Sequence, residues 1–292
     1  MKSQKKIGYF YAIGAFTFWG LVPIYFKAVS FVPAFEVLAN RIVWSVVFLA
    51  FLLIITKQYK YLKNIFQTPK QLKMLLLSSL LVTTNWLIFI IAINTNQLTQ
   101  ASFGYFVNPL VSMFLAFLFL KEKLNKVQSF AVLLAFTAVL YQIFTLKSFP
   151  FIALALAFSF AFYGLVRKKI NLVAMPGLFI ETLLISPVAF FYMLYLDATK
   201  VSHLHLSLDH STLLLILAGF ITVVPLAWFN AAATKIPYST LGFIQYIGPT
   251  LSFLLALFLY HEPFDIHKFI SFFIIWVALF IFSINSFYNS KK

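Results

Sequence analysis

Long apolar runs dominate the chain and stop at short polar segments. Runs such as 7–25, 37–55 and 74–93 contain almost no charged residue. An α-helix needs about 20 apolar residues to cross roughly 30 Å of hydrocarbon. The pattern therefore predicts ten membrane-spanning helices, near residues 7–27, 35–56, 72–93, 100–120, 126–146, 149–167, 176–196, 212–233, 238–260 and 267–287.

The composition agrees with an all-α membrane protein. Of 292 residues, 62% are hydrophobic and only 10% are charged, which is far from the make-up of a soluble domain. Ten spans would use about 200 residues, so we expect short loops and no soluble catalytic domain. The sequence has no GxxxxGK[ST] phosphate-binding motif, which excludes transport powered by ATP hydrolysis within this chain.

The basic residues give the expected orientation. With the N-terminus inside, cytoplasmic segments hold 17 of the 22 Lys and Arg residues, outer segments hold four, and Arg41 lies within a span. An excess of Lys and Arg marks cytoplasmic loops. We expect both termini in the cytoplasm and interpret the net charge of +15 as a topology signal, not as a sign of nucleic-acid binding.

The chain contains an internal repeat. The stretch 18–22 resembles 162–166, and the spacing from Pro109 to Glu122 recurs from Pro249 to Glu262. The repeat predicts two halves, 1–146 and 147–292, of five spans each. Because five is odd, the second half must cross the membrane in the inverted sense, an arrangement that recurs in secondary transporters.

The chain resembles the drug/metabolite transporter superfamily, specifically its EamA-type RarD branch. The resemblance covers nearly the whole chain and rests on short stretches in most spans. These are Phe18-Trp19-Gly20 with Pro23 and Lys27, Asn40-Arg41 with Trp44-Ser45, Asn85-Trp86, Gly104-Tyr105-Phe106 with Asn108-Pro109, Ser239-Thr240-Leu241-Gly242-Phe243 with Gln245-Tyr246 and Pro249, and Tyr260 with Glu262-Pro263. The resemblance implies two inverted five-helix EamA-type repeats and movement of a small molecule across the bacterial inner membrane.

Several polar and aromatic residues are predicted near the membrane midplane. Pro109 and Pro249 each remove a helical hydrogen bond there, and such breaks at repeat-related positions favour a binding site. We expect a central cavity walled by spans 1, 3, 4, 6, 8 and 9. Its candidate substrate contacts are Trp19, Asn85, Trp86, Tyr105, Asn108, Tyr163, Gln245 and Tyr246. For each residue alone, helix packing is the alternative.

Two charged residues lie within the predicted spans, Arg41 and Glu181. Charges at this depth are costly and usually have a partner or a function. Arg41 is a candidate for substrate binding, with snorkelling to the outer interface as the alternative. Glu181 is the candidate for proton coupling, with a hydrogen-bonded structural acid as the alternative. Their predicted depths on opposite sides of the midplane disfavour a direct ion pair.

We expect no cofactor and no bound metal. His203, His205, Asp209 and His210 cluster in an outer loop, but their spacing matches no standard metal site. The expected partners are a small-molecule substrate and the lipid bilayer, with a monomer or weak homodimer as the assembly. A secondary transporter working by alternating access is the leading function. A passive channel or facilitator and an intramembrane lipid-modifying enzyme are the alternatives, although no cluster of catalytic side chains favours an enzyme.

The first helix of the small multidrug relatives carries a glutamate that exchanges protons for cationic drugs. Spans 1 and 6 contain no acid here. This departure disfavours cationic drug antiport by that route. A metabolite such as an amino acid, or another small anion or zwitterion, fits Arg41 better.

Overall fold

The computed structural model describes residues 2–94, 98–145, 151–204, 209–260 and 266–291. Within these ranges the chain is helical and has no β-strand. The helices are α1 (Lys2–Ala28), α2 (Ala34–Ile55), α3 (Lys60–Phe66), α4 (Pro69–Asn94), α5 (Leu98–Leu120), α6 (Lys126–Thr145), α7 (Phe151–Ile170), α8 (Ala174–Ala198), α9 (His210–Ala233), α10 (Tyr238–Ile244), α11 (Ile247–Phe258) and α12 (Ile266–Lys291).

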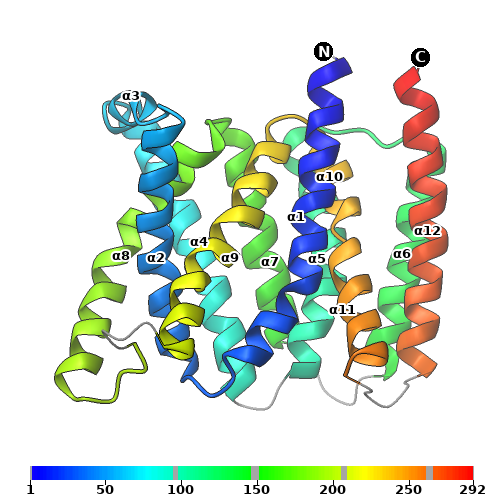
Figure 1. The fold of residues 1–292 in the computed structure, drawn as a ribbon. Helices are drawn as coiled ribbons and strands as arrows, with labels where there is room; N and C mark the ends of the chain where they lie inside the picture. The colour runs from blue at the N-terminus through cyan, green and yellow to red at the C-terminus, as the bar shows by residue number, and fades with distance from the viewer. Residues whose placement is uncertain (1, 95–97, 146–150, 205–208, 261–265, 292) are drawn as a thin grey trace.

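The long helices run side by side as a bundle, with both chain termini and α3 at the same end (Figure 1). Eight helices, namely α1, α2 and α4 to α9, are long and apolar enough to cross a membrane. In α12 the apolar segment is shorter, at Phe269–Asn285. The ninth predicted span is divided between α10 and α11, and the short helix α3 was not among the predicted elements.

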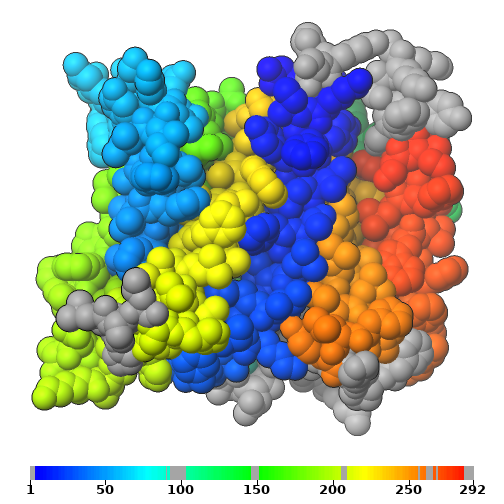
Figure 2. Space-filling view, in the orientation of Figure 1, coloured from blue at the N-terminus to red at the C-terminus, as the bar shows by residue number. Residues whose placement is uncertain are grey.

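The two halves of the chain interleave. α1 packs against α9 and α11, whereas α7 packs against α4 and α5. α2 contacts α8 and α9, and α6 contacts α12. Figure 2 shows one result, in which the side chains of α9 fill the face between α1 and α2. The first helix of each half is therefore held mainly by helices of the other half.

Glycines permit close contacts between these helices, as Gly20 and Gly104 show. A Cβ atom on Gly20 of α1 would meet Leu251 Cβ at 2.6 Å, and one on Gly104 of α5 would meet the Ala153 carbonyl oxygen at 2.9 Å. Small residues at helix interfaces are the usual means of close packing where lipid removes the hydrophobic drive between helices. Buried alanines continue the same interfaces along α1, α6, α7 and α9.

Large apolar side chains cover the outside of the bundle. Phe144 is 83% exposed and Val188 is 77% exposed, as suits contact with lipid chains. A groove of about 500 Å³ between α2 and α9 is lined entirely by apolar and aromatic residues: Trp44, Val47, Phe48, Phe51, Leu213, Ile216, Leu217 and Phe220. The surface chemistry agrees with a protein whose solvent is the bilayer.

The two predicted helix breaks differ in the structure. α5 runs through Pro109 without interruption, whereas the helix before Pro249 divides into α10 and α11. Pro249 lacks an N–H group, and the Gln245 carbonyl accepts instead from Gly248 N at 3.1 Å. Glycine has low helix propensity, and Gly242 and Gly248 flank the Gln245–Tyr246 junction on both sides. Pro109 has only Gly104 nearby, so its helix stays continuous.

Candidate functional site

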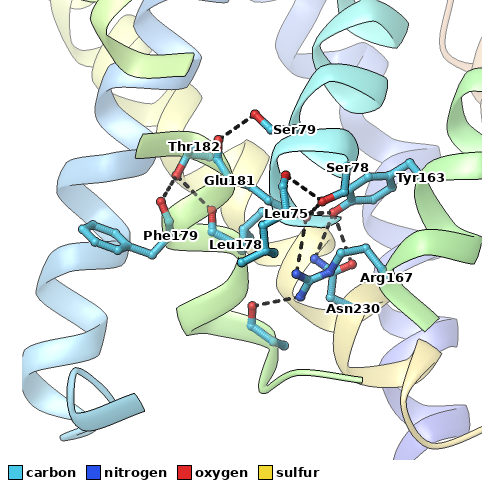
Figure 3. A network of polar contacts seen from close by, with 11 residues as sticks. Leu75, Ser78, Ser79, Tyr163, Arg167, Leu178, Phe179, Glu181, Thr182 and Asn230 are labelled. Carbon is cyan, nitrogen blue, oxygen red and sulfur yellow. Dashed lines mark hydrogen bonds and ion pairs between the residues drawn. The ribbon is translucent and has the colours of Figure 1, made fainter. Parts of the chain in front are cut away.

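A polar network surrounds Glu181 inside the bundle (Figure 3). Glu181 is 1% exposed, and one carboxylate oxygen accepts from the Ser78 hydroxyl and pairs with Arg167 Nη1 at 3.4 Å. The Tyr163 hydroxyl lies 3.5 Å from the other oxygen and accepts from Asn230 Nδ2 at 2.9 Å. The network joins α4, α7, α8 and α9, so it holds both halves together around one buried carboxylate.

Arg167, at the end of the predicted span 149–167, counts among the 17 cations expected on the cytoplasmic side, but it is 2% exposed. Segment 171–173 connects α7 and α8 so tightly that residues near the two helix ends face each other. Gly177 makes room for the guanidinium, since a Cβ there would lie 2.5 Å from Arg167 Nη1. The short connection after Arg167 was the available signal that this cation could reach Glu181.

The environment of Arg41 on α2 is different. Its Nε donates to Thr222 Oγ1 on α9 at 2.9 Å. The guanidinium carbon lies 5.0 Å from the centre of the Trp86 ring and 5.4 Å from that of Phe26. No carboxylate of the described residues pairs with it. Arg41 is thus a partly exposed cation between aromatic rings, without an ion-pair partner in the described chain.

Close packing of α2 on α9 holds Arg41 in position. A Cβ on Gly219 would lie 2.5 Å from the carbonyl carbon of Trp44, so only glycine fits this contact. The Ser45 hydroxyl is 3.4 Å from the Gly219 carbonyl oxygen across the same interface. This packing brings Thr222, one turn along α9, to the Arg41 side chain.

Tyr105 joins the Arg41 surroundings from α5. It is 46% exposed. Its ring contacts Phe89, which in turn contacts Phe26, at centroid distances of 6.2 and 6.1 Å. Of the sequence-predicted residues, the structure therefore gathers Arg41, Trp86 and Tyr105.

Trp19 and Tyr163 belong to a second aromatic cluster, between α1, α7 and α9. Both rings contact Phe160 and Phe229, and Tyr163 stacks on Phe229 at an interplanar angle of 19°. Tyr163 is fully buried, and its hydroxyl belongs to the Glu181 network. This cluster links the Glu181 network to the middle of the bundle.

The remaining predicted polar residues do not gather around one space. Asn85 on α4 donates to the Leu156 carbonyl oxygen at 2.9 Å and to Ser159 Oγ at 3.0 Å, both on α7. Asn108 accepts from Ser112 within its own helix at 3.2 Å. Gln245 lies at the α10–α11 junction and is 7% exposed.

Tyr246, next to Gln245, is fully buried. Its hydroxyl has no hydrogen-bond partner among the described residues. A buried, unpaired hydroxyl carries a free-energy cost, so its position calls for an explanation.

Of the residues predicted to cluster in an outer loop, His203 and Asp209 have separate contacts. His203 Nδ1 lies 2.8 Å from Glu36 Oε2, and Glu36 is 1% exposed. Asp209 caps α9 by accepting from Thr212 N at 2.8 Å. His205 lies outside the described residues. The described part of the chain holds no group of three potential metal ligands.

Comparison with known proteins relates the chain to one family of transporters. A model of the EamA-like transporter family matches residues 6–144. The chain is 47% identical over 289 residues to the protein RarD of Escherichia coli, covering 99% of this chain and 98% of that protein. It is 48% identical over 284 residues to an uncharacterized transporter of Vibrio cholerae, covering 97% and 94%. A solved crystal structure of 14% identity, covering 97% and 98% of the two chains, has a TM-score of 0.70 and supports the fold alone.

Proposed function

Because this chain belongs to the EamA-type RarD branch of the drug/metabolite transporter superfamily and is a membrane transporter, we propose that it is a secondary carrier. It moves a small metabolite or drug-like molecule across the bacterial inner membrane by alternating access. Residues 1–146 and 147–292 form two inverted repeats of five spans each. α10 and α11 together make the ninth span, and α12 makes the tenth.

Matching helix ends carry the proposal of an inverted repeat. α2 is followed by Thr56-Lys57 and α8 by Thr199-Lys200, and in both pairs the Lys adopts a positive φ, of 55° and 56°. Each Thr hydroxyl donates to the carbonyl four residues back, at 2.7 and 2.8 Å. The end of α2 lies beside α3 and the end of α8 lies at the opposite end of the bundle (Figure 1). The same local structure on opposite sides is what an inverted repeat requires.

The packing partners support the same symmetry. Exchanging the two halves replaces α1 with α7, α4 with α9, and α5 with α10–α11. The contacts of α1 with α9 and α11 then become those of α7 with α4 and α5, while the pairs α2–α8 and α6–α12 map onto themselves. Such a pair of equivalent bodies can adopt two related conformations, one open to each side.

The loop charges support cytoplasmic termini, at the end of the bundle where α3 lies. We expect cysteines introduced by Lys60→Cys and Val201→Cys to separate cleanly, because the chain has no native cysteine. An impermeant thiol reagent on intact cells should label position 201 and not position 60. Labelling of position 60 in sealed cells would reverse the proposed orientation.

The substrate is proposed to bind between the halves near Arg41, Trp86 and Tyr105. Trp19, Asn85, Asn108, Tyr163, Gln245 and Tyr246 are proposed to contribute contacts in another conformation of the cycle. Glu181 keeps two proposed roles. It either exchanges a proton when the Arg167 pair opens or serves as a structural ion pair, which its complete set of partners supports.

Alternating access can be tested without knowing the substrate. Spin labels would be placed by Lys63→Cys and Lys235→Cys at the α3 end, and by Ser30→Cys and Val201→Cys at the other end. In lipid nanodiscs we expect two distance populations for each pair, with the long distance at one end matched by the short distance at the other. A single narrow population at both ends would overturn alternating access and favour a channel or facilitator.

A further inference from the structure

We propose that Arg41 binds the carboxylate of a small monocarboxylate substrate with a flat, apolar body. The inference rests on the proposed carrier function and adds the chemical class of its solute. Three observations carry it: the free donors of the guanidinium, the absence of a described acid that pairs with it, and the aromatic rings around it.

The hydrogen-bond donors of Arg41 are only partly used. Nε is bound to Thr222 Oγ1, while the terminal nitrogens have no hydrogen-bond partner among the described residues. Thr222 is 1% exposed and itself donates to the Ala218 carbonyl oxygen at 2.7 Å, so the acceptor is fixed. Anchoring through Nε leaves the terminal nitrogens able to bind an anion. Guanidinium groups bind carboxylates through paired, charge-assisted hydrogen bonds.

The buried acids that could have paired with Arg41 already have other partners. Glu181 pairs with Arg167, and Glu36 accepts from His203 N at 2.6 Å and contacts the His203 ring. A charged Arg within a membrane span is costly without a counter-ion. The missing negative charge is therefore supplied by the solute.

The rings define the rest of the solute. Trp86 and Phe26 lie under the guanidinium, and Tyr105 with Phe89 extends the aromatic surface across α4 and α5. A single cation balances a single carboxylate. Because no described acid lies in this cluster to receive an ammonium group, a simple carboxylate fits better than an amino acid.

Tryptophan fluorescence of the purified full-length chain in nanodiscs tests the inference, because Trp86 contacts Arg41. The probes are phenylacetate, its neutral amide phenylacetamide, and phenylalanine. We expect phenylacetate to bind roughly ten- to a hundredfold more tightly than phenylacetamide, since hydrogen bonds to a charged group are lost in the amide. Phenylalanine should bind less tightly than phenylacetate.

Two variants locate the effect. Arg41→Gln should bring the affinity for phenylacetate down to that for phenylacetamide, and Arg41→Lys should restore only part of it because the fork geometry is lost. Lys27→Gln is the matched control, because Lys27 is an exposed cation that lies over the Tyr260 ring instead. The affinities of this variant for phenylacetate and for phenylacetamide should both stay within about twofold of the wild-type values.

Three results would overturn the inference: no binding of phenylacetate to the wild-type chain, equal binding of the acid and the amide, or full phenylacetate affinity in folded Arg41→Gln. The comparison of acid with amide needs no variant, so it holds even if Arg41→Gln fails to fold. The spin-label distances do not depend on the ligand. Failure of the carboxylate inference is thereby distinguished from failure of the carrier proposal.

Discussion

Arg41 and Glu181 occupy the same position along their helices, yet their surroundings are opposite. Each is the eighth residue of its helix, in α2 and α8 respectively. Glu181 has a cation, two hydroxyls and a fully buried setting, whereas Arg41 has one hydroxyl, aromatic rings and partial exposure. In one half the buried charge is neutralised by the chain itself, and in the other it is left available.

This difference predicts a structural role for the Glu181 charge and a binding role for the Arg41 charge. A buried ion pair contributes little net stability against apolar replacements, but removing one partner is strongly destabilising. The Glu181 network should therefore respond to mutation mainly through folding. The Arg41 cluster should respond mainly through ligand affinity, because its missing partner is not part of the described chain.

The largest expected effect is the loss of Arg167. Arg167→Met leaves the Glu181 carboxylate without its counter-ion and should lower the free energy of unfolding by about 3–5 kcal/mol. The double variant Arg167→Met with Glu181→Leu should recover more than half of that loss. Denaturant unfolding followed by tryptophan fluorescence would measure both.

Lys169→Met is the matched control for this pair, because Lys169 is an exposed cation two residues further along α7. Its effect on the unfolding free energy should stay within about 0.5 kcal/mol. A double variant no more stable than Arg167→Met would contradict a structural role and favour proton coupling through Glu181. Retention of proton-dependent transport in Glu181→Gln would end the coupling role instead.

The next largest effect is expected at two glycines, Gly219 near Arg41 and Gly177 near the Arg167–Glu181 pair. Gly219→Ala places a Cβ against the Trp44 backbone, which cannot move without shifting α2, and should cost about 1–3 kcal/mol of stability. The three atoms nearest to a Cβ on Gly177 all belong to the Arg167 side chain, so most of the cost of Gly177→Ala should disappear in an Arg167→Met background. Thermal unfolding of the single and double variants would decide. Additive losses for Gly177→Ala and Arg167→Met would refute the contact.

A smaller effect is expected at Thr222, in ligand affinity. Thr222→Val keeps the shape but removes the acceptor for Arg41 Nε, and Thr222→Ser keeps the acceptor. One hydrogen bond of about 0.5–1.5 kcal/mol corresponds to a two- to tenfold weaker affinity for phenylacetate. Equal affinities in the Val and Ser variants would show that Thr222 does not orient the guanidinium.

The sequence predicted the helical membrane fold because the bilayer imposes a strict rule on helix length and polarity. The helical membrane fold and the family follow from apolar runs and from short motifs such as Asn40-Arg41 and Asn85-Trp86. The partners of the buried charges were harder to predict. Arg167 sits among loop-type cations in the sequence, and only the tight connection 171–173 brings it to Glu181.

The sequence also did not predict that the ninth span divides into two helices. Pro109 and Pro249 look equivalent in the repeat, but flanking glycines make only the second a break. Asn85 was grouped with Asn108 by depth along the helix, and depth alone does not say which way a side chain points. The structure directs Asn85 to α7 and Asn108 to its own helix.

The last comparison concerns two buried tyrosine hydroxyls, one partnered and one not, and the smallest expected effect is at the unpartnered one. The Tyr163 hydroxyl accepts from Asn230 Nδ2 and donates to Glu181 Oε2 at 3.5 Å, so Tyr163→Phe should cost about 1–3 kcal/mol of stability by leaving buried polar groups unpaired. Tyr246 has no such partner in the described chain, so Tyr246→Phe should leave the stability unchanged or raise it by about 1 kcal/mol. Unfolding of the two variants side by side, with phenylacetate titrations of each, measures both properties. A Tyr246→Phe variant of full stability but weakened ligand affinity would place the hydroxyl in the substrate site. A loss of stability equal to that of Tyr163→Phe would show that the hydroxyl has a structural partner, and the distinction between partnered and free buried groups would fail at this position.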